Sequence, residues 1–211
     1  MQARLASSRT LASRRWQRPA RAARSRSDAA TAGARSHSTI ERAAEAGLVG
    51  CSIEDASDHE IRAVGDAGER IAAAVAAAKA LGAPFLITAR AENFLHGRPD
   101  LADTVRRLQA YEEAGADVLY APGLTTIEQV REITAALRGP VNVVVGSWNA
   151  QMTVAELEAA GVARISVGGG LARSALTALH GAASEIREHG TFSYAGSALG
   201  EAELYRLFEA G

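Results

Sequence analysis

The chain has 211 residues, of which 47% are hydrophobic and 5% aromatic, and its formal net charge is −1. A chain of this length can bury one sizeable core, and the low aromatic content favours a tightly packed α/β protein over an aromatic-rich β-sandwich. The single cysteine, Cys51, excludes a disulfide framework, and no apolar run approaches the roughly 20 residues that a membrane span requires. These features predict a cytoplasmic protein without a membrane partner.

The first 37 residues differ in composition from the rest of the chain. Residues 1–35 hold nine arginines and one acid, Asp28, whereas the remainder holds 14 basic and 23 acidic side chains, a net charge of −9. Because segment 1–37 lacks periodic large apolar side chains, we predict that it is disordered and that the folded domain spans 38–211.

Other interpretations of this basic segment exist. Its composition also permits an organellar transit peptide, or translated sequence that is foreign to the fold. A nucleic-acid-binding arm is compatible with its charge, but only Trp16 could stack on a base, and the acidic body carries no basic stripe that would follow phosphates. We therefore expect no nucleic-acid partner.

From residue 39 onward, helical patterns alternate with short apolar strands. The predicted helices span 39–47, 61–81, 101–114, 126–137, 154–160, 171–189 and 201–209. The predicted strands span 48–53, 84–90, 117–120, 140–145 and 164–167. Near-continuous apolar strands that alternate with helices predict a parallel sheet covered by helices.

The regular repeat predicts the fold class. The similar helix-to-strand turns at 114–117 and 160–163 are typical of a parallel (β/α) TIM-type barrel. A doubly wound sheet is the alternative, but it usually has a glycine-rich loop after its first strand, and residues 54–57 are not such a loop. About five βα units do not close an eight-stranded barrel, so we predict an incomplete barrel with open edges. Either three units are missing from its front, or it completes itself by association.

In such a barrel the functional groups lie at the carboxyl ends of the strands. The polar and glycine residues at these ends are Ser52, Glu54, Asp55, Arg90, Glu92, Asn93, Tyr120, Gly146, Ser147, Asn149 and Gly168 to Gly170. Carboxylates beside an arginine are suited to hold a divalent cation and an anionic substrate, although Glu54 and Arg90 are equally compatible with a structural ion pair. The three glycines before the last long helix suit either anion binding or a tight turn.

Three segments carry a family resemblance. Residues 50–55 (GCSIED), 85–92 (FLITARAE) and 108–117 (LQAYEEAGAD) resemble consecutive motifs of the isocitrate lyase/phosphoenolpyruvate mutase superfamily. The resemblance implies a Mg²⁺-dependent barrel that makes or breaks a C–C or P–C bond beside the carboxylate of a small 2-oxo acid, through an enolate-like intermediate. It also implies that Glu54 belongs to the ligand or water-ligand shell of the metal and that Arg90 binds the substrate carboxylate, with Ser52 and Ser147 as further substrate-binding candidates.

Several departures from the family pattern qualify this implication. Residues 1–37 do not match the strands whose aspartates supply the family's main metal ligands. The lyases' flexible Lys-Cys-Gly-His loop is replaced by residues 55–61, which we expect to run straight into a helix, so cysteine-assisted cleavage of isocitrate or methylisocitrate is disfavoured. Pro122 stands where many members have an acid, and Gly146 where many have asparagine. The chain thus resembles the loop-poor branch.

Two alternative functions remain open, a catalytically silent truncated scaffold and a phosphate-binding barrel. The last helix has Leu204, Leu207 and Phe208 on one stripe, which predicts packing on a neighbouring element. Because the final helix of this superfamily is often exchanged between subunits, the resemblance implies a homo-oligomer.

Overall fold

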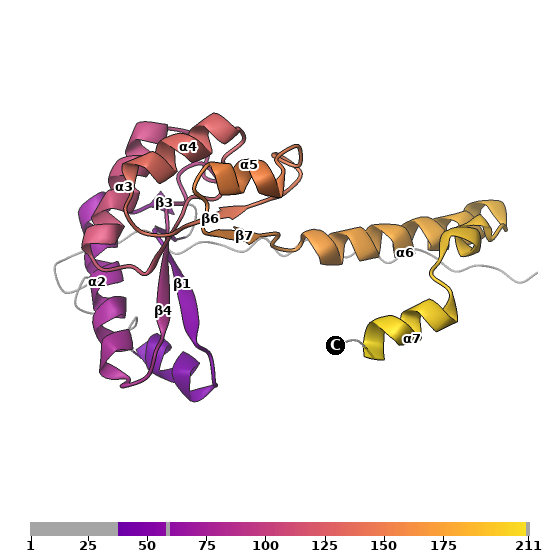
Figure 1. Ribbon diagram of the computed structural model, residues 1–211, viewed down its shortest axis with the longest axis horizontal. Coiled ribbons are helices and arrows are strands. Elements are labelled where there is room, and N and C mark those ends of the chain that lie inside the picture. Colours follow the sequence, from indigo (N-terminus) through magenta and orange to yellow (C-terminus); the bar gives the residue numbers. More distant parts are fainter. Residues whose placement is uncertain (1–37, 58–59, 210–211) are drawn as a thin grey trace, which may run out of the picture.

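The computed structural model describes residues 38–57 and 60–209, so the segment 1–37, predicted to be disordered, lies outside the described residues. Within them, one parallel sheet has five strands in the order β1-β4-β5-β6-β7 (Figure 1). The strands are β1 (Gly50–Glu54), β4 (Leu86–Arg90), β5 (Val118–Tyr120), β6 (Val141–Val144) and β7 (Arg164–Ser166). Because strand order follows chain order without reversal, the sheet winds as a (β/α) barrel does and not as a doubly wound sheet.

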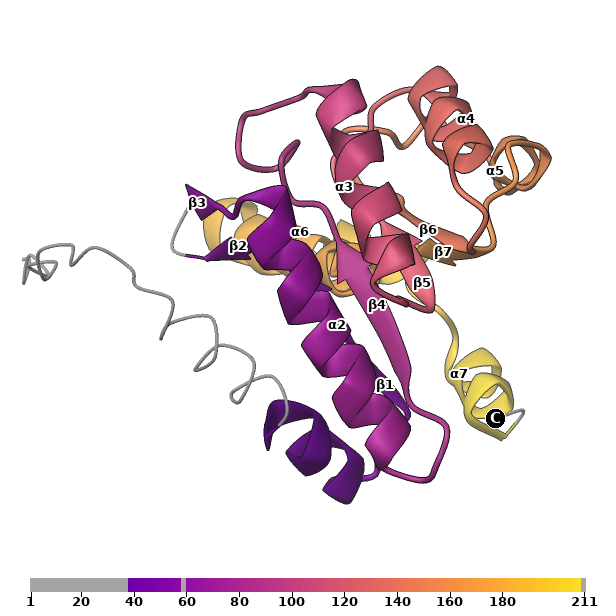
Figure 2. The ribbon, with the colours of Figure 1, turned by 90° about the vertical axis from the view of Figure 1, so that its left-hand side faces the viewer.

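The helices lie where the sequence pattern predicts them. They are α2 (Val64–Ala80), α3 (Leu101–Glu113), α4 (Ile127–Ala136), α5 (Val154–Ala159), α6 (Gly170–His189) and α7 (Glu201–Glu209), with a further helical segment at 38–45 and a 3₁₀ helix, η1 (Ser193–Ser197). Figure 2 shows α2 and α3 side by side over one face of the sheet. The prediction of an incomplete parallel barrel of five βα units is confirmed.

Side-chain caps fix where three of these helices begin. The carboxylate of Asp100 accepts the Asp103 amide at the start of α3. Thr126 and Thr153 begin α4 and α5 with capping boxes that Gln129 and Glu156 complete. Each cap satisfies amides that the first helical turn leaves without a partner, so each helix begins at a defined residue.

The hydrophobic core lies between the sheet and helices α2 to α5. In each strand, alternate residues face the helices, and Ile87, Leu119 and Val143 are almost completely buried there. Ile71 of α2 and Leu108 of α3 meet them from the helical side. The opposite face of the sheet carries polar side chains, and it is the face that a closed barrel would enclose.

The connection from β1 to α2 contradicts one expectation from the sequence. Residues 55–61 do not run straight into a helix, because β2 (Ala56–Ser57) and β3 (Glu60–Ile61) pair as a short antiparallel arm. Arg62 then closes this arm, since its Nη2 donates to Ser57 Oγ at 3.1 Å and its amide donates to the Asp55 carbonyl at 2.8 Å. These contacts delay the start of α2 to Val64.

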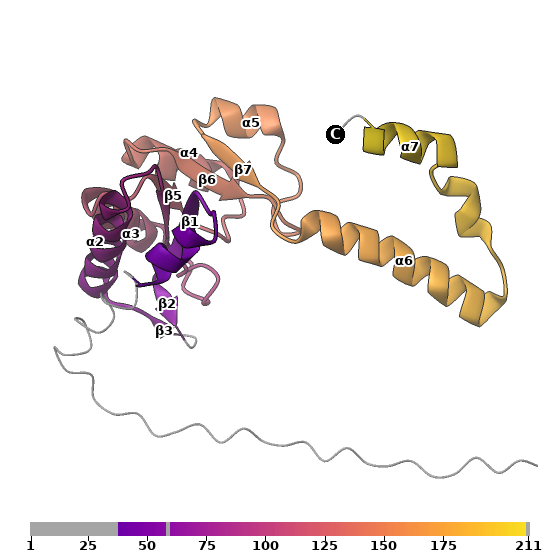
Figure 3. The ribbon, with the colours of Figure 1, turned by 90° about the horizontal axis from the view of Figure 1, so that it is seen from below.

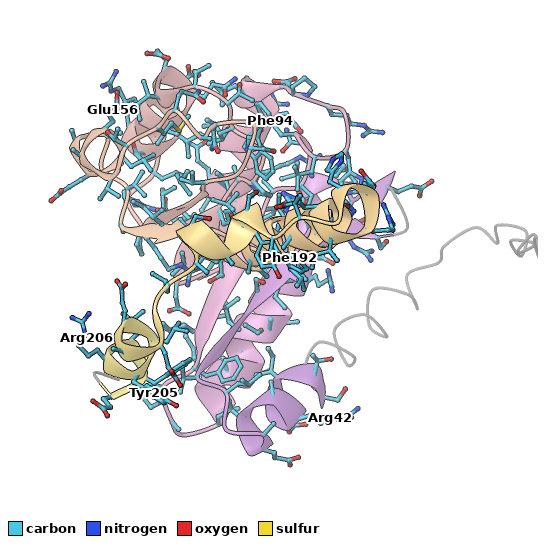
Figure 4. All side chains as sticks on the ribbon, turned by 90° about the vertical axis from the view of Figure 1, so that its right-hand side faces the viewer. Arg42, Phe94, Glu156, Phe192, Tyr205 and Arg206 are labelled. Atoms are coloured by element: carbon cyan, nitrogen blue, oxygen red, sulfur yellow. The ribbon has the colours of Figure 1, made fainter. Side chains whose placement is uncertain are left out.

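We call residues 170–209 the C-terminal arm. Figures 1 and 3 show that α6 runs away from the sheet after β7 and that the chain then turns back through η1 to α7. Neither α6, η1 nor α7 contains a buried residue, and Figure 4 labels Phe192 and Tyr205 on this segment. The predicted stripe of the last helix therefore has no packing partner within the described part of the chain. None of the described helices is both long and apolar enough to cross a membrane.

Candidate active site

Glu54 and Arg90 meet at the carboxyl edge of the sheet, as the sequence predicts. They are the last residues of the neighbouring strands β1 and β4 and are paired directly in the parallel register. Arg90 Nη1 lies 3.1 Å from Glu54 Oε1, and the Glu54 side chain is 50% exposed whereas that of Arg90 is 21% exposed. The carboxylate thus faces solvent at the rim, while the guanidinium is held closer to the sheet.

A second acid, Glu92, holds Arg90 from the other side. Arg90 Nε donates to Glu92 Oε1 at 2.6 Å, although only 3% of the Glu92 surface is exposed. Burial raises the pKa of Glu92 above its usual value, in spite of the hydrogen-bonded Arg90, and the negative charges of Glu54 and Asp55 act in the same direction as burial. The sequence marked Glu92 only as one of many polar residues near a strand end. Glu92 lies beyond the end of β4, where the alternation of strand residues no longer predicts which way a side chain points.

Tyr120 forms the floor beneath the guanidinium. It pairs with Arg90 in the register between β4 and β5, and the Arg90 Cζ atom lies 4.9 Å from the centre of its ring. This cation–π contact is worth about 0.5–1 kcal/mol at a partly exposed position. Burial raises the pKa of the Tyr120 phenol, so it remains protonated and adds no competing negative charge. Arg90 is therefore held by three neighbours, Glu54, Glu92 and Tyr120.

A buried network lies on the helical side of this rim. Asp55 is 3% exposed, and its carboxylate accepts hydrogen bonds from Tyr111 Oη at 2.6 Å and Arg107 Nη1 at 3.1 Å. A charged residue on an amphipathic helix is usually solvated, but Arg107 is only 7% exposed and also binds Asp103. Asp103, Arg107 and Tyr111 follow one another at four-residue spacing on α3. In the sequence, this spacing already indicates that the three side chains share one face of the helix.

Other predicted site residues lie apart from this cluster. Ser52 is exposed on β1, on the same face as Glu54, and pairs with Thr88 of β4. Ser147 is exposed in the loop after β6. Asn149 of that loop is fully buried, and it accepts the Gly146 amide and donates to the Val144 carbonyl. Asn149 thus shapes the loop and does not face a ligand.

The glycines before α6 form a tight turn. Gly168 has a φ of +50°, a conformation that favours glycine, and the Gly170 amide donates to the Val167 carbonyl at 2.8 Å. That amide is engaged within the turn, so the turn interpretation has direct support. Anion binding at these residues stays a prediction.

The described residues do not by themselves fit a metal centre. Across 38–57 and 60–209, no group of three or more His, Cys, Asp or Glu side chains lies close enough together to hold a metal ion. Glu54 and Glu92 are the acids at the rim, and both already bind the Arg90 guanidinium.

A parallel sheet wound in chain order, with charged side chains gathered at its carboxyl edge, is the arrangement of (β/α)-barrel proteins, whose active sites lie at the strand ends. Residues 28–187 match the phosphoenolpyruvate phosphomutase family, and the chain belongs to this family. The resemblance to the isocitrate lyase/phosphoenolpyruvate mutase superfamily is thereby confirmed. No curated protein has a sequence that matches the chain.

Solved structures agree with this placement. A candidate lyase/mutase from Burkholderia cenocepacia J2315 is 52% identical, with a TM-score of 0.79 over 84% of this chain and 65% of its own. A candidate phosphonomutase from the same organism is 38% identical, with a TM-score of 0.65 over 71% of this chain and 62% of its own. Oxaloacetate acetylhydrolase in complex with the inhibitor 3,3-difluorooxalacetate is 25% identical, with a TM-score of 0.66 over 76% of this chain and 57% of its own. The chain thus spans less than two thirds of the length of each of these structures.

Proposed function

We propose that the protein containing this chain is a lyase or phosphonomutase-type enzyme that acts on a small 2-oxo acid or a related carboxylate. The observation that carries the proposal is the Arg90 guanidinium, held at the rim by Glu54 and Glu92. The names of the structural relatives support the substrate class, because they include a phosphonomutase and an enzyme of oxaloacetate. Cleavage of a P–C bond and cleavage of a C–C bond both fit this class.

In this proposal Arg90 binds the substrate carboxylate. A guanidinium has five N–H donors, and here Nε and Nη1 each direct one toward an acid, which leaves donors for a bidentate contact with a ligand. The same positive charge stabilises an enolate-like intermediate, because negative charge then develops next to the bound carboxylate. Ser52 and Ser147 are proposed as further hydroxyl contacts of the substrate.

A Mg²⁺ cofactor belongs to the proposal for the whole protein and rests on the family alone. Glu54, an exposed carboxylate at the rim, would contribute to the ligand or water-ligand shell. The other ligands have no counterpart among the described residues, so no reaction step is assigned to the metal here.

The lack of a complete ligand cluster in the described residues favours a second candidate of a different class, a catalytically silent scaffold that keeps the barrel architecture. The two candidates differ in the role of Arg90. In a silent scaffold, Arg90 is only a structural partner of Glu54 and Glu92. In the enzyme, it also binds an anionic ligand.

Oxalate, a compact dicarboxylate, is the probe that separates the two. Calorimetric titration of the chain with oxalate is expected to give saturable binding that Arg90→Ala abolishes while the fold, followed by circular dichroism, is retained. The matched control is Arg106→Ala, because the Arg106 side chain is 64% exposed on α3 and contacts Asp103. Saturable binding that survives in Arg90→Ala would rule out the assignment, and no binding by the wild-type chain would favour the scaffold.

We also propose that the protein is a cytoplasmic homo-oligomer. The exposed apolar residues of the C-terminal arm support a second copy as the partner, since monomeric proteins rarely expose so many together. Cys51, a free thiol half-buried in β1, is in keeping with a reducing compartment.

A further inference from the structure

Asp55 links the rim to α3, and each of its polar groups has a partner. Its amide donates to the Arg90 carbonyl at 3.2 Å, and its carbonyl accepts the Arg62 amide at 2.8 Å. Its Oδ1 accepts the Glu92 amide at 2.8 Å, while Oδ2 accepts Tyr111 and Arg107. A buried carboxylate with this many partners is strongly held, because each lost partner would leave a costly unsatisfied group.

The partner at Oδ1 connects this network to Arg90. Glu92 is the residue whose side chain receives the Arg90 Nε–H, and the Asp55 carboxylate fixes the backbone of that same residue. The Asp55 amide also donates to the Arg90 carbonyl. Asp55 therefore holds the backbone of both Arg90 and Glu92. The conformation that points the Glu92 carboxylate back at Arg90 therefore depends on Asp55.

Helix α3 anchors Asp55 in turn. Arg107 Nη1 donates both to Asp55 and to the Arg62 carbonyl, and Arg107 Nε binds Asp103 at 2.7 Å. The Tyr111 hydroxyl, on a fully buried ring, makes the shortest contact with Asp55. These residues place a rigid support on the side of the sheet opposite to the substrate face.

We propose that Asp55 is a positioning residue that orients Arg90 for its anionic ligand, acting through the Glu92 amide with Tyr111 and Arg107 as its support. This inference rests on the proposed function for the identity of the ligand, but the orientation itself is measurable without any ligand. Asp55 does not face the rim, so it acts through Glu92 and makes no contact with substrate.

The experiment follows hydrogen exchange of the Arg90 Nε–H by nuclear magnetic resonance in the full chain, together with the free energy of unfolding in urea. Asp55→Ala removes the acceptor of the Glu92 amide, and Arg90 protection is expected to fall by about tenfold or more, as the loss of a buried hydrogen bond implies. Asp55→Asn keeps a carbonyl oxygen for the Glu92 amide but places an NH₂ group against Arg107. It is therefore expected to lose stability while Arg90 protection stays near the wild-type value.

The control is Glu112→Gln, on the same helix but in contact with the Arg138 and Gly139 amides away from the rim. A merely structural role for Asp55 predicts that Arg90 protection follows global stability across all three variants, and that pattern would overturn the proposal. If Asp55→Ala does not fold, hydrogen exchange of the wild-type chain tests the proposal instead. The Glu92 amide and the Arg90 Nε–H should then have protection factors within about threefold of each other and below that of global unfolding. A difference above about tenfold, or two factors that both match global unfolding, overturns the proposal.

Oxalate titration of the same variants separates the two proposals. A wild-type chain that shows the coupled exchange pattern but does not bind oxalate contradicts the proposed function and leaves the positioning role intact. A chain that binds oxalate with unchanged affinity in Asp55→Ala retains the proposed function and overturns the positioning role.

Discussion

Glu92 accepts the Nε–H of Arg90 at 2.6 Å while it is buried almost completely beneath the rim. In the folded chain, the ionised Glu92 carboxylate is removed from water. Its only opposite charge among these neighbours is the Arg90 guanidinium, which also contacts Glu54. Burial outweighs the guanidinium, so the pKa of Glu92 is raised. The balance between these effects is open to measurement through the pH dependence of stability.

Glu92→Gln is expected to make the chain more stable relative to wild type as pH rises. Below the usual glutamate pKa of 4.5, the wild-type carboxyl is protonated in both states. Above 4.5, the carboxyl ionises first in the unfolded chain because its folded pKa is higher, so wild type loses stability until pH exceeds the folded pKa. Urea denaturation of both proteins across this pH range measures the difference in the free energy of unfolding.

Glu156→Gln provides a control with the opposite sign. Hydrogen bonds from the Thr153 backbone and side chain lower the pKa of Glu156, so wild type should gain stability over this variant as pH rises toward 4.5. A Glu92→Gln curve that runs parallel to the Glu156→Gln curve would contradict the raised pKa of Glu92.

Leu119→Ala tests the placement of the core. Leu119 is fully buried in the middle strand β5, so its truncation is expected to cost about 2–5 kcal/mol, because it leaves a cavity between the sheet and the helices. Leu199→Ala is the matched control, since Leu199 is 51% exposed on the C-terminal arm and should change stability by less than about 0.5 kcal/mol. If urea denaturation shows the same loss of unfolding free energy for both variants, Leu119 does not belong to the core.

The sequence predicted the pairing of Glu54 with Arg90 for a physical reason. Each residue ends an apolar strand, and neighbouring parallel strands bring their carboxyl ends to one edge, so the register follows from the pattern. The same rules could not predict that Glu92 turns back on Arg90, because no periodic rule applies after a strand ends. They also missed the burial of Arg107, since a charged residue on an amphipathic helix is usually solvated.

The C-terminal arm shows another limit of sequence patterns. An amphipathic stripe predicts that a helix packs against something apolar, and Leu204, Leu207 and Phe208 do form such a stripe. The pattern does not say whether the partner belongs to the same chain. In the structure these residues are 40%, 60% and 83% exposed, so the partner has to be sought elsewhere.

Mg²⁺ is expected to bind the chain only weakly. Glu54 and Glu92 both contact Arg90, whose positive charge opposes a nearby cation, and the described residues offer no cluster of three ligands. Calorimetric titration with Mg²⁺ should therefore show no saturable heat, and the melting temperature should not change. Saturable binding that Glu54→Gln removes would instead establish a metal site at the rim of this chain.

The apolar stripe of α6 is expected to form the interface of the proposed homo-oligomer. Leu176, Leu179 and Ile186 recur at three- and seven-residue spacing and are 62%, 65% and 42% exposed, so they form one exposed face of the helix. The double change of Leu176 and Leu179 to glutamate would bury two charges in any interface on this face, and it is expected to yield monomers at concentrations where wild type associates. Light scattering coupled to size-exclusion chromatography measures the mass of both.

Ser174→Glu, which lies on the opposite side of α6, adds a charge without touching the stripe and should leave the oligomer intact. A wild-type chain that is monomeric, or a double variant that keeps the wild-type mass, would show that this face does not join two copies.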